Sequence, residues 1–539
     1  MEEKDLLNAM NDIEDRHILD AQPVKKEKGA GRKRLEALGI AAACACIAVG
    51  AAAWISKKPA GPQPGDMQDP AQGGGGAQPA AGLSGADVPG GNSSSSVSGN
   101  VQGGGNYAGA VFADYAVAQA QYPESLPEPK SAMFIDASGE LDGEAFHAAV
   151  EAYRAERTGR INGSESYRSR LYPFYGTTMR ELLVSDEHVN RAYSPLNLYI
   201  ALSMLSELTG GESRAQLLTL LDAHDIEAVR ESASALWLAN YSDSSLVTST
   251  LANSLWLRQD VDFVPETMQG LADIYQASSF RGDMESEEFL RAFQAWLNEQ
   301  TGGLLKEQAG ALKLDGNTVL ELASTIYFRA QWQDRFYEEN TAEGTFHAAS
   351  GDITCDFMHR SGIQSYYRGD NFSAVCCDLA LSGGMWLFLP DEDASVNEVI
   401  ESGEALRLLR ESSAWENRRT VQVDLSLPKF DIVSDLDLIE ALKAMGVTDI
   451  FDERLADFSP MAENRDGVTV GEARHAARVL VDEEGCTAAA YTVLAMNDSA
   501  AIMQERADFV LDRPFLFAVT GADGSILFLG VVEEPQQIE

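Results

Sequence analysis

Residues 481–492 read VDEEGCTAAAYT, an acidic step followed by small, uncharged residues without a proline. The alanines of this run favour helix, whereas Gly485, Thr487 and Thr492 do not. Local propensity therefore leaves the conformation of the run open. An apolar, aromatic segment, FVLDRPFLF, follows at 509–517, and the state of the run has to be inferred from what surrounds it.

The bulk composition describes a large, acidic chain. It has 539 residues, 45% of them hydrophobic, and a formal net charge of −42. This length and composition supply a sizeable core, and the negative charge repels polyanions, which argues against a nucleic acid partner. No C-x-x-C spacing occurs, and two cysteines lie in an apolar run, so neither a disulfide framework nor a zinc site is predicted. The cysteines are Cys44, Cys46, Cys355, Cys376, Cys377 and Cys486.

An apolar run, ALGIAAACACIAVGAAAWI, occupies residues 37–55. As a helix it is about 28 Å long, close to the roughly 30 Å hydrocarbon core of a bilayer. More Lys and Arg residues precede the run than follow it, so the positive-inside rule predicts a signal-anchor helix with a cytoplasmic N-terminus and the rest of the chain outside. The alternative is a cleaved signal peptide and a secreted product. The basic residues before the run are Lys25, Lys26, Lys28, Arg32, Lys33 and Arg34.

The remaining chain divides by composition. A tract of Gly, Ser, Ala, Pro and Gln cannot bury enough apolar surface to fold, and its roughly 70 residues would have a reach of about 45 Å as a flexible tether. Phe146, Val150 and Tyr153 have helical spacing, which predicts a short helix over 143–157. The predicted organisation is a leader at 1–34, an anchor at 35–56, a linker at 57–130, an appended helical segment at 131–170 and a main domain at 171–539.

Helix and strand patterns mix along the main domain. Residues 246–260, 317–332 and 383–391 are predicted strands, and 286–303 is a predicted helix closed by glycine. This order favours an α+β fold around a large sheet.

Common enzyme motifs are absent: the chain has no H-E-x-x-H, no P-loop, no G-x-G-x-x-G and no EF-hand loop. Cys355 and His359 are four residues apart, but their segment is predicted to be extended, which separates the two side chains by about 13 Å. We predict no catalytic residue, no cofactor and no metal site, and a buried thiol at Cys355.

Several segments resemble the serpin family in one consistent order over roughly 170–534. NRAYSPLNLYIALSMLSELTGGESRAQLL at 190–218 is similar to the family's second-helix region, and LELASTIYFRAQWQDRFYEENT at 320–341 is similar to a strand that runs into a tryptophan-containing turn. FMHRSG, LFLPD, LSLPKFDI, ALKAMGVTDIF, ADFSPM, the acidic step and FVLDRPFLFAVTGADGSILFLGVV follow. The chain is identified as a member of this family, of a membrane-tethered bacterial type.

The resemblance implies a fold of three β-sheets, about eight to nine helices and an exposed reactive-centre loop. It also implies a suicide mechanism: a target serine protease cleaves the loop, and the freed part inserts as a new strand into the main sheet while it carries the acylated protease. The hinge of that loop would be Glu483, Glu484, Gly485, Cys486, Thr487, Ala488, Ala489, Ala490, Tyr491 and Thr492.

The hinge residues suit insertion on physical grounds. Alternate side chains of a strand share a face, and the face that would point to the core is small or apolar. Gly485 to Asn497 holds neither proline nor charge, and proline would delete a ladder hydrogen bond. Cys486 and Thr487 depart from the threonine and glutamate usual in the family. The inward residues would be Cys486, Ala488, Ala490, Thr492, Leu494 and Met496.

The resemblance also indicates where the loop is cut. Counting about sixteen residues from Glu483 gives Ser499-Ala500 as the reactive bond, with Met496 and Met503 as alternatives because loop length varies. The window MNDSAAIM lacks Arg and Lys, which favours elastase-like, subtilisin-like or chymotrypsin-like targets.

Two groups of residues would control opening of the main sheet. Ser194, Asn197, Ser324 and His475 match a buried polar network, in which Asn197 and Ser324 have exchanged the family's usual residue types; we hypothesise that the exchange preserves one amide and one hydroxyl for His475. Glu483 and Lys429 match a salt bridge beside Trp332.

The predicted function is a monomeric, membrane-tethered, extracytoplasmic inhibitor that forms a covalent complex with serine proteases. The alternatives are a non-inhibitory serpin-fold binding protein and an inhibitor of cysteine proteases.

Overall fold

The computed structural model describes a set of ranges that belong to one compact unit of the chain. Strands and helices alternate irregularly along these ranges, so the fold is α+β, as predicted. The described residues are 110–120, 122–123, 129–135, 141–244, 247–303, 305–314, 316–462, 468–471, 473–486 and 505–535.

The first sheet runs across the molecule in the strand order β1-β5-β4-β6-β14-β13-β12, with β3 paired to β4. The strand predictions for 246–260 and 317–332 are confirmed by β4 and β6. β4 buries almost every residue, because helices α8 and α10 pack against it. The bounds are β1 (Ala116–Ala118), β3 (Ser242–Asp243), β4 (Val247–Arg258), β5 (Ala277–Gly282), β6 (Leu320–Gln331), β12 (Phe430–Asp437), β13 (Arg474–Val481) and β14 (Gly485–Cys486).

The other strands form two sheets that are continuous through the long strand β8. One sheet has the order β15-β11-β8-β7, and the other continues from the end of β8 as β9-β10-β16-β17-β2. The strand prediction for 383–391 is confirmed by β10. The bounds are β2 (Arg191–Tyr193), β7 (Thr341–Ala348), β8 (Gly351–Arg368), β9 (Phe372–Asp378), β10 (Gly384–Pro390), β11 (Arg418–Pro428), β15 (Arg506–Val510), β16 (Phe515–Thr520) and β17 (Ile526–Val532).

Nine α-helices of seven residues or more lie within the described residues, together with the six-residue helices α11 and α14. The predicted helix at 286–303 is α10: the Ser286 hydroxyl accepts from the Phe289 N–H at its start, and Gly302 and Gly303 follow its end with positive φ. The bounds are α4 (Gly143–Arg168), α5 (Tyr172–Leu183), α6 (Pro195–Leu208), α7 (Gly211–Leu220), α8 (Ile226–Asn240), α9 (Pro265–Tyr275), α10 (Glu287–Gln300), α11 (Lys306–Ala311), α12 (Val396–Ser402), α13 (Glu404–Glu411) and α14 (Ile439–Ala444).

The N-terminal part of the described chain packs on the fold. The helix predicted over 143–157 continues to Arg168 as α4, and α4 packs along α8. Residues 110–120, which the composition assigns to the linker, form β1 on the edge of the first sheet and bury Phe112. The packed chain therefore begins earlier than its composition indicates.

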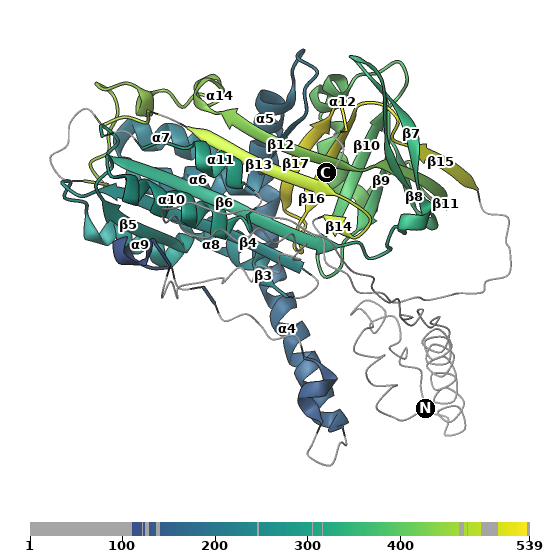
Figure 1. The fold of residues 1–539 in the computed structure, drawn as a ribbon, viewed down its shortest axis with the longest axis horizontal. Helices are drawn as coiled ribbons and strands as arrows, with labels where there is room; N and C mark the ends of the chain where they lie inside the picture. The colour runs from purple at the N-terminus through teal and green to yellow at the C-terminus, as the bar shows by residue number, and fades with distance from the viewer. Residues whose placement is uncertain are drawn as a thin grey trace, which may run out of the picture. The chain divides into compact units, whose positions relative to one another are not determined.

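Helices pack against the first sheet, and β14 lies between β6 and β13 (Figure 1). Among the described residues, no helix is both long and apolar enough to cross a bilayer. The predicted leader at 1–34, the anchor at 35–56 and the linker up to residue 109 lie outside the described residues.

Candidate functional site

A tight turn at Asp482–Glu484 joins β13 to β14. The Asp482 carboxylate accepts hydrogen bonds from the backbone N–H groups of Glu484 and Gly485, at 2.9 and 3.2 Å. Trp332, directly after β6, binds the turn from the other side: its indole Nε1 donates to the Asp482 carbonyl at 2.8 Å, and its backbone N–H donates to the Glu484 carbonyl at 3.1 Å. The polar backbone groups of the turn are therefore satisfied before β14 begins.

Gly485 begins β14 at a position that only glycine fits. A Cβ atom there would lie 2.2 Å from the carbonyl oxygen of Ala330, which belongs to β6. The next residue, Cys486, pairs with Ala330 on one side and with Val481 of β13 on the other, and both pairings are antiparallel. A strand that continues in this register from Cys486 would lie between β6 and β13.

The Glu483 carboxylate ties the turn to the neighbouring sheet. Its Oε2 lies 3.0 Å from Lys429 Nζ, and its Oε1 accepts a hydrogen bond from the Thr341 hydroxyl at 2.7 Å. Burial by itself would raise the pKa of Glu483, but the Thr341 hydrogen bond and the Lys429 ammonium outweigh it, so the pKa lies below its usual range. Glu483 therefore stays charged at neutral pH. Thr341 was not among the predicted site residues.

A second polar group lies at the start of α6. Ser194 caps this helix, because its hydroxyl accepts from the Asn197 N–H at 3.2 Å. The Ser194 N–H donates to Nε2 of His475, which is 6% exposed, at 2.9 Å. Burial lowers the pKa of His475 to about 4, although Asp435 acts in the opposite sense. The imidazole is therefore a neutral acceptor at neutral pH, and it links α6 to β13.

Asn197 and Ser324 bond to each other. The Asn197 amide nitrogen donates to the Ser324 carbonyl at 2.9 Å, and the Ser324 hydroxyl lies 2.6 Å from Asn197 Oδ1 and 2.7 Å from Asn253 Oδ1. Since a hydroxyl has one proton, it serves one of these two acceptors at a time. The hypothesis that the exchanged pair serves His475 is wrong, because His475 takes its hydrogen bond from the Ser194 backbone. Asn253 was missed, because Thr248, Ser249, Thr250 and Ser254 make it one of several polar residues in β4.

Much of the predicted reactive loop lies outside the described residues. For Cys486 only the backbone is described. The hinge residues and the alternative reactive bonds that fall outside are Thr487, Ala488, Ala489, Ala490, Tyr491, Thr492, Met496, Ser499, Ala500 and Met503.

The cysteines of the described chain offer no nucleophile. Cys355 lies in β8, and burial, assisted by Asp356, raises the pKa of its thiol to about 11. His359 Nδ1 lies 2.8 Å from the Ser426 hydroxyl. Burial also raises the pKa of Cys376 and of Cys377, both in β9. Within the ranges that the structure describes, no group of three or more His, Cys, Asp or Glu side chains is arranged to hold a metal.

Known proteins are similar to this chain in sequence. Serpin-ZX of Arabidopsis thaliana is 28% identical over 370 residues, covering 65% of this chain and 93% of that protein. The leukocyte elastase inhibitor of Homo sapiens is 30% identical over 352 residues, covering 64% of this chain and 92% of that protein.

Among solved structures, the native state of the thermophilic serpin tengpin is similar with a TM-score of 0.61 at 24% identity, covering 69% of this chain and 94% of that one. The native stressed conformation of AtSerpin1 from Arabidopsis has a TM-score of 0.59 at 26% identity, covering 68% of this chain and 98% of that one. A family model described as "Serpin (serine protease inhibitor)" matches residues 174–535. Because this match spans well over half of its length, the chain belongs to the serpin family.

Proposed function

We propose that this chain is a membrane-tethered, outward-facing and monomeric inhibitor of serine proteases, which acts by cleavage of its loop and insertion of the hinge into the first sheet. The observation that carries the proposal is the position of β14 between β6 and β13. The first two residues of this strand already pair with both neighbours in antiparallel register. Extension of β14 toward Met496 in the same register would add a full strand that is antiparallel to both β6 and β13.

Energetics support insertion over an exposed loop. About a dozen new backbone hydrogen bonds at a net 0.5–1.5 kcal/mol each would stabilise the inserted form by something on the order of 10 kcal/mol, before side-chain burial is counted. The inward side chains after Cys486 are Ala488, Ala490 and Thr492. Small residues at these positions suit both a solvated loop and a buried strand.

The target class follows from the loop sequence and from the relatives. Ser499-Ala500 presents small side chains, which fit an elastase-like or subtilisin-like pocket, and Met496 or Met503 would fit a chymotrypsin-like one. One relative at 30% identity is a leukocyte elastase inhibitor, which supports the same class. Thyroxine-binding globulin has the same fold at 23% identity and was solved with thyroxine bound, so the fold alone does not separate inhibition from ligand binding.

The inhibitory mechanism can be tested with the full chain in detergent. Incubation with pancreatic elastase is expected to give a covalent band near the summed masses on a denaturing gel, and a released C-terminal peptide that starts at Ala500 or a neighbour. Ala488→Arg places a charge on the inward face and should convert the inhibitor into a cleaved substrate. Ala489→Arg, one residue along on the outward face, is the matched control and should keep the covalent band.

Different outcomes separate the competing functions. Clean cleavage of the unaltered chain, without a covalent band and without a rise in thermal stability, would reject insertion and favour a binding protein. A covalent band with a cysteine protease alone would reassign the target class.

The tether has its own test. When the full chain is expressed in a bacterial host, it should fractionate with membranes, and protease added to intact cells should cleave it. Soluble protein in the culture medium would instead indicate that the N-terminal segment is removed.

A further inference from the structure

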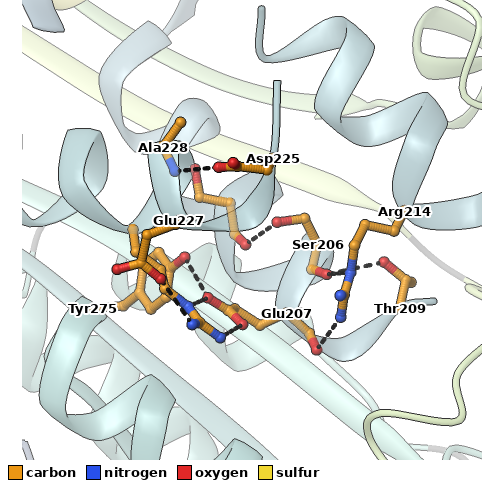
Figure 2. Close-up of polar contacts among 10 residues, drawn as sticks. Ser206, Glu207, Thr209, Arg214, Asp225, Glu227, Ala228 and Tyr275 are labelled. Carbon is orange, nitrogen blue, oxygen red and sulfur yellow. Dashed lines mark hydrogen bonds and ion pairs between the residues drawn. The ribbon is translucent and has the colours of Figure 1, made fainter. Parts of the chain in front are cut away.

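Glu207, near the end of α6, has a carboxylate side chain, and the residue is buried with 7% of its surface exposed. Arg230 of α8 binds it with two donors: Nε lies 2.7 Å from Oε1 and Nη2 lies 2.8 Å from Oε2. The Tyr275 hydroxyl, at the end of α9, donates to Oε1 at 3.0 Å (Figure 2). Three helices therefore meet at one buried charge, and we name Glu207, Arg230 and Tyr275 the α6 latch.

The protonation states of Arg230 and Tyr275 are fixed. The hydrogen bond to Glu207 raises the pKa of Arg230, and burial together with the Glu207 charge raises the pKa of Tyr275. Arg230 thus remains a cation and Tyr275 remains a hydrogen-bond donor at any physiological pH. A bidentate pair of this kind is directional. Glu207 is its buried member, whereas the Arg230 side chain is 36% exposed and also donates to Glu227 Oε2 at 3.2 Å, so removing the Glu207 charge weakens the pair without leaving Arg230 unpaired.

Tyr275 also connects the latch to the polar group at the other end of α6. Its backbone carbonyl, left free by the end of α9, accepts from the Asn253 amide at 2.7 Å. The Ser324 hydroxyl can donate to Asn253 Oδ1, and the Ser324 carbonyl accepts from the Asn197 amide. A continuous series of hydrogen bonds therefore leaves α6 at Asn197, crosses β6 and β4, and returns to α6 at Glu207, about 15 Å further along the helix.

The latch joins α6 to helices that lie on the other side of the opening between β6 and β13. The start of α6 is held on the β13 side, because Ser194 binds His475 of β13 and β2, directly before it, pairs with β17; the body of α6 packs on β17 and also on β6. In contrast, α8 packs on β4, and α9 packs on β5, which belong to the β6 side. A strand inserted between β6 and β13 has to widen their separation to two ladder spacings of about 4.8 Å each. The contacts between α6 and the β6 side therefore lie across the movement.

We propose that the α6 latch sets the threshold for opening of the first sheet, with Glu207 as a positioning residue that holds α8 and α9 on α6 until the loop is cut. This inference rests on the proposed insertion mechanism. It assigns to Glu207 a role in the rate of insertion and not in protease contact. The latch is intact before insertion and released after it.

The test compares the uncleaved and the loop-cleaved full chain in detergent. Glu207→Gln removes the charge and keeps the shape. On warming, the uncleaved protein is expected to convert to a heat-resistant form, and Glu207→Gln should raise the rate of this conversion about tenfold. This is the effect expected from the loss of one charge-assisted hydrogen bond. The substitution should leave the unfolding temperature of the cleaved protein unchanged. Tyr275→Phe removes one hydroxyl and should give a smaller increase, about threefold, which keeps the test available if Glu207→Gln does not fold.

The matched control is Asp431→Asn. Asp431 pairs with Arg478 at 2.5 Å, but both residues lie on the β13 side, in β12 and β13. This variant should lower the unfolding temperature of the cleaved and the uncleaved form equally. Its rate of conversion to the heat-resistant form should equal that of the unaltered chain.

Two outcomes overturn the latch. Equal losses of unfolding temperature in cleaved and uncleaved Glu207→Gln would reduce Glu207 to a structural tie, as would an unchanged conversion rate in both latch variants. If the unaltered chain shows no rise in thermal stability on cleavage, insertion itself fails and the latch fails with it, and this result is recognised without any variant.

Discussion

β1 and β14 are both strands of two or three residues added to the same sheet, but different forces hold them. β1 lies on an outer edge, anchored by Phe112, which is 1% exposed and meets the Phe280 ring edge-on at 5.7 Å. β14 lies between two strands and is anchored by polar groups, the Trp332 indole and the Glu483–Lys429 pair.

The difference has a consequence for the two states of a serpin. Apolar burial is non-directional and depends on area, so the β1 anchor is expected to persist while strands move relative to one another. Hydrogen bonds and ion pairs depend on geometry, so the anchor of β14 holds in one arrangement of the turn. Under the proposed insertion mechanism, the edge strand would be a permanent part of the fold and the central strand a conditional one.

The largest expected effect is at the edge strand. Phe112→Ala should lower the free energy of unfolding by about 3–5 kcal/mol, the usual cost of truncating a buried Phe. Because the β1 anchor does not depend on the loop, the loss should be the same before and after cleavage. Chemical denaturation of both forms measures it.

The control is the neighbouring Val111→Ala, since Val111 is exposed and its truncation should change little. A loss at Phe112 that is confined to the uncleaved form would break the comparison, because β1 would then take part in insertion.

A second effect concerns His475, near the start of β13, the strand that borders β14. His475 has a pKa of about 4 in the fold against an ordinary value of 6.5, so the unfolded chain takes up its proton first as the pH falls. Its contribution is complete above pH 6.5 and should be lost between pH 6.5 and pH 4, to a total of roughly 3 kcal/mol.

The measurement is the pH dependence of unfolding in His475→Gln, whose amide oxygen can accept from Ser194. This variant should have a flatter profile than the unaltered chain between pH 6.5 and pH 4. His224→Gln, at a highly exposed histidine, should leave the profile unchanged. A parallel shift of the whole profile in His475→Gln would mean that the residue packs without titrating in this range.

The central strand was accessible from sequence and the edge strand was not. The hinge was predicted because the segments around the acidic step resemble the serpin family in order, and the prediction of Glu483, Lys429 and Trp332 rested on that resemblance alone. Residues 110–120 lie in a tract whose average composition is that of a linker. The available signal was local: Phe112 and Tyr115 interrupt a tract otherwise poor in aromatics.

The α6 latch was also beyond sequence reasoning. Arg230 lies 23 residues after Glu207 in the sequence, and Tyr275 lies 68 residues after it. Each of the three residues alone is typical of a solvated helix face. Only the packing of three helices shows that Glu207 is buried. A polar contact between distant elements leaves no periodicity, whereas the apolar faces of β4 and α10 do.

The smallest effect sharpens the comparison at the central strand. Lys429→Met removes the ammonium from Glu483 but keeps the Thr341 hydrogen bond, and it should lower the stability of the uncleaved form by about 0.5–1 kcal/mol, with a dependence on salt. Because insertion reshapes the turn, the cleaved form should lose nothing. Lys443→Met, which breaks an exposed pair with Glu440 on α14, should behave alike in both forms. An equal loss in both forms of Lys429→Met would mean that the turn at Glu483 survives insertion, and the distinction between a permanent and a conditional strand would then rest on the ladder of β14 alone.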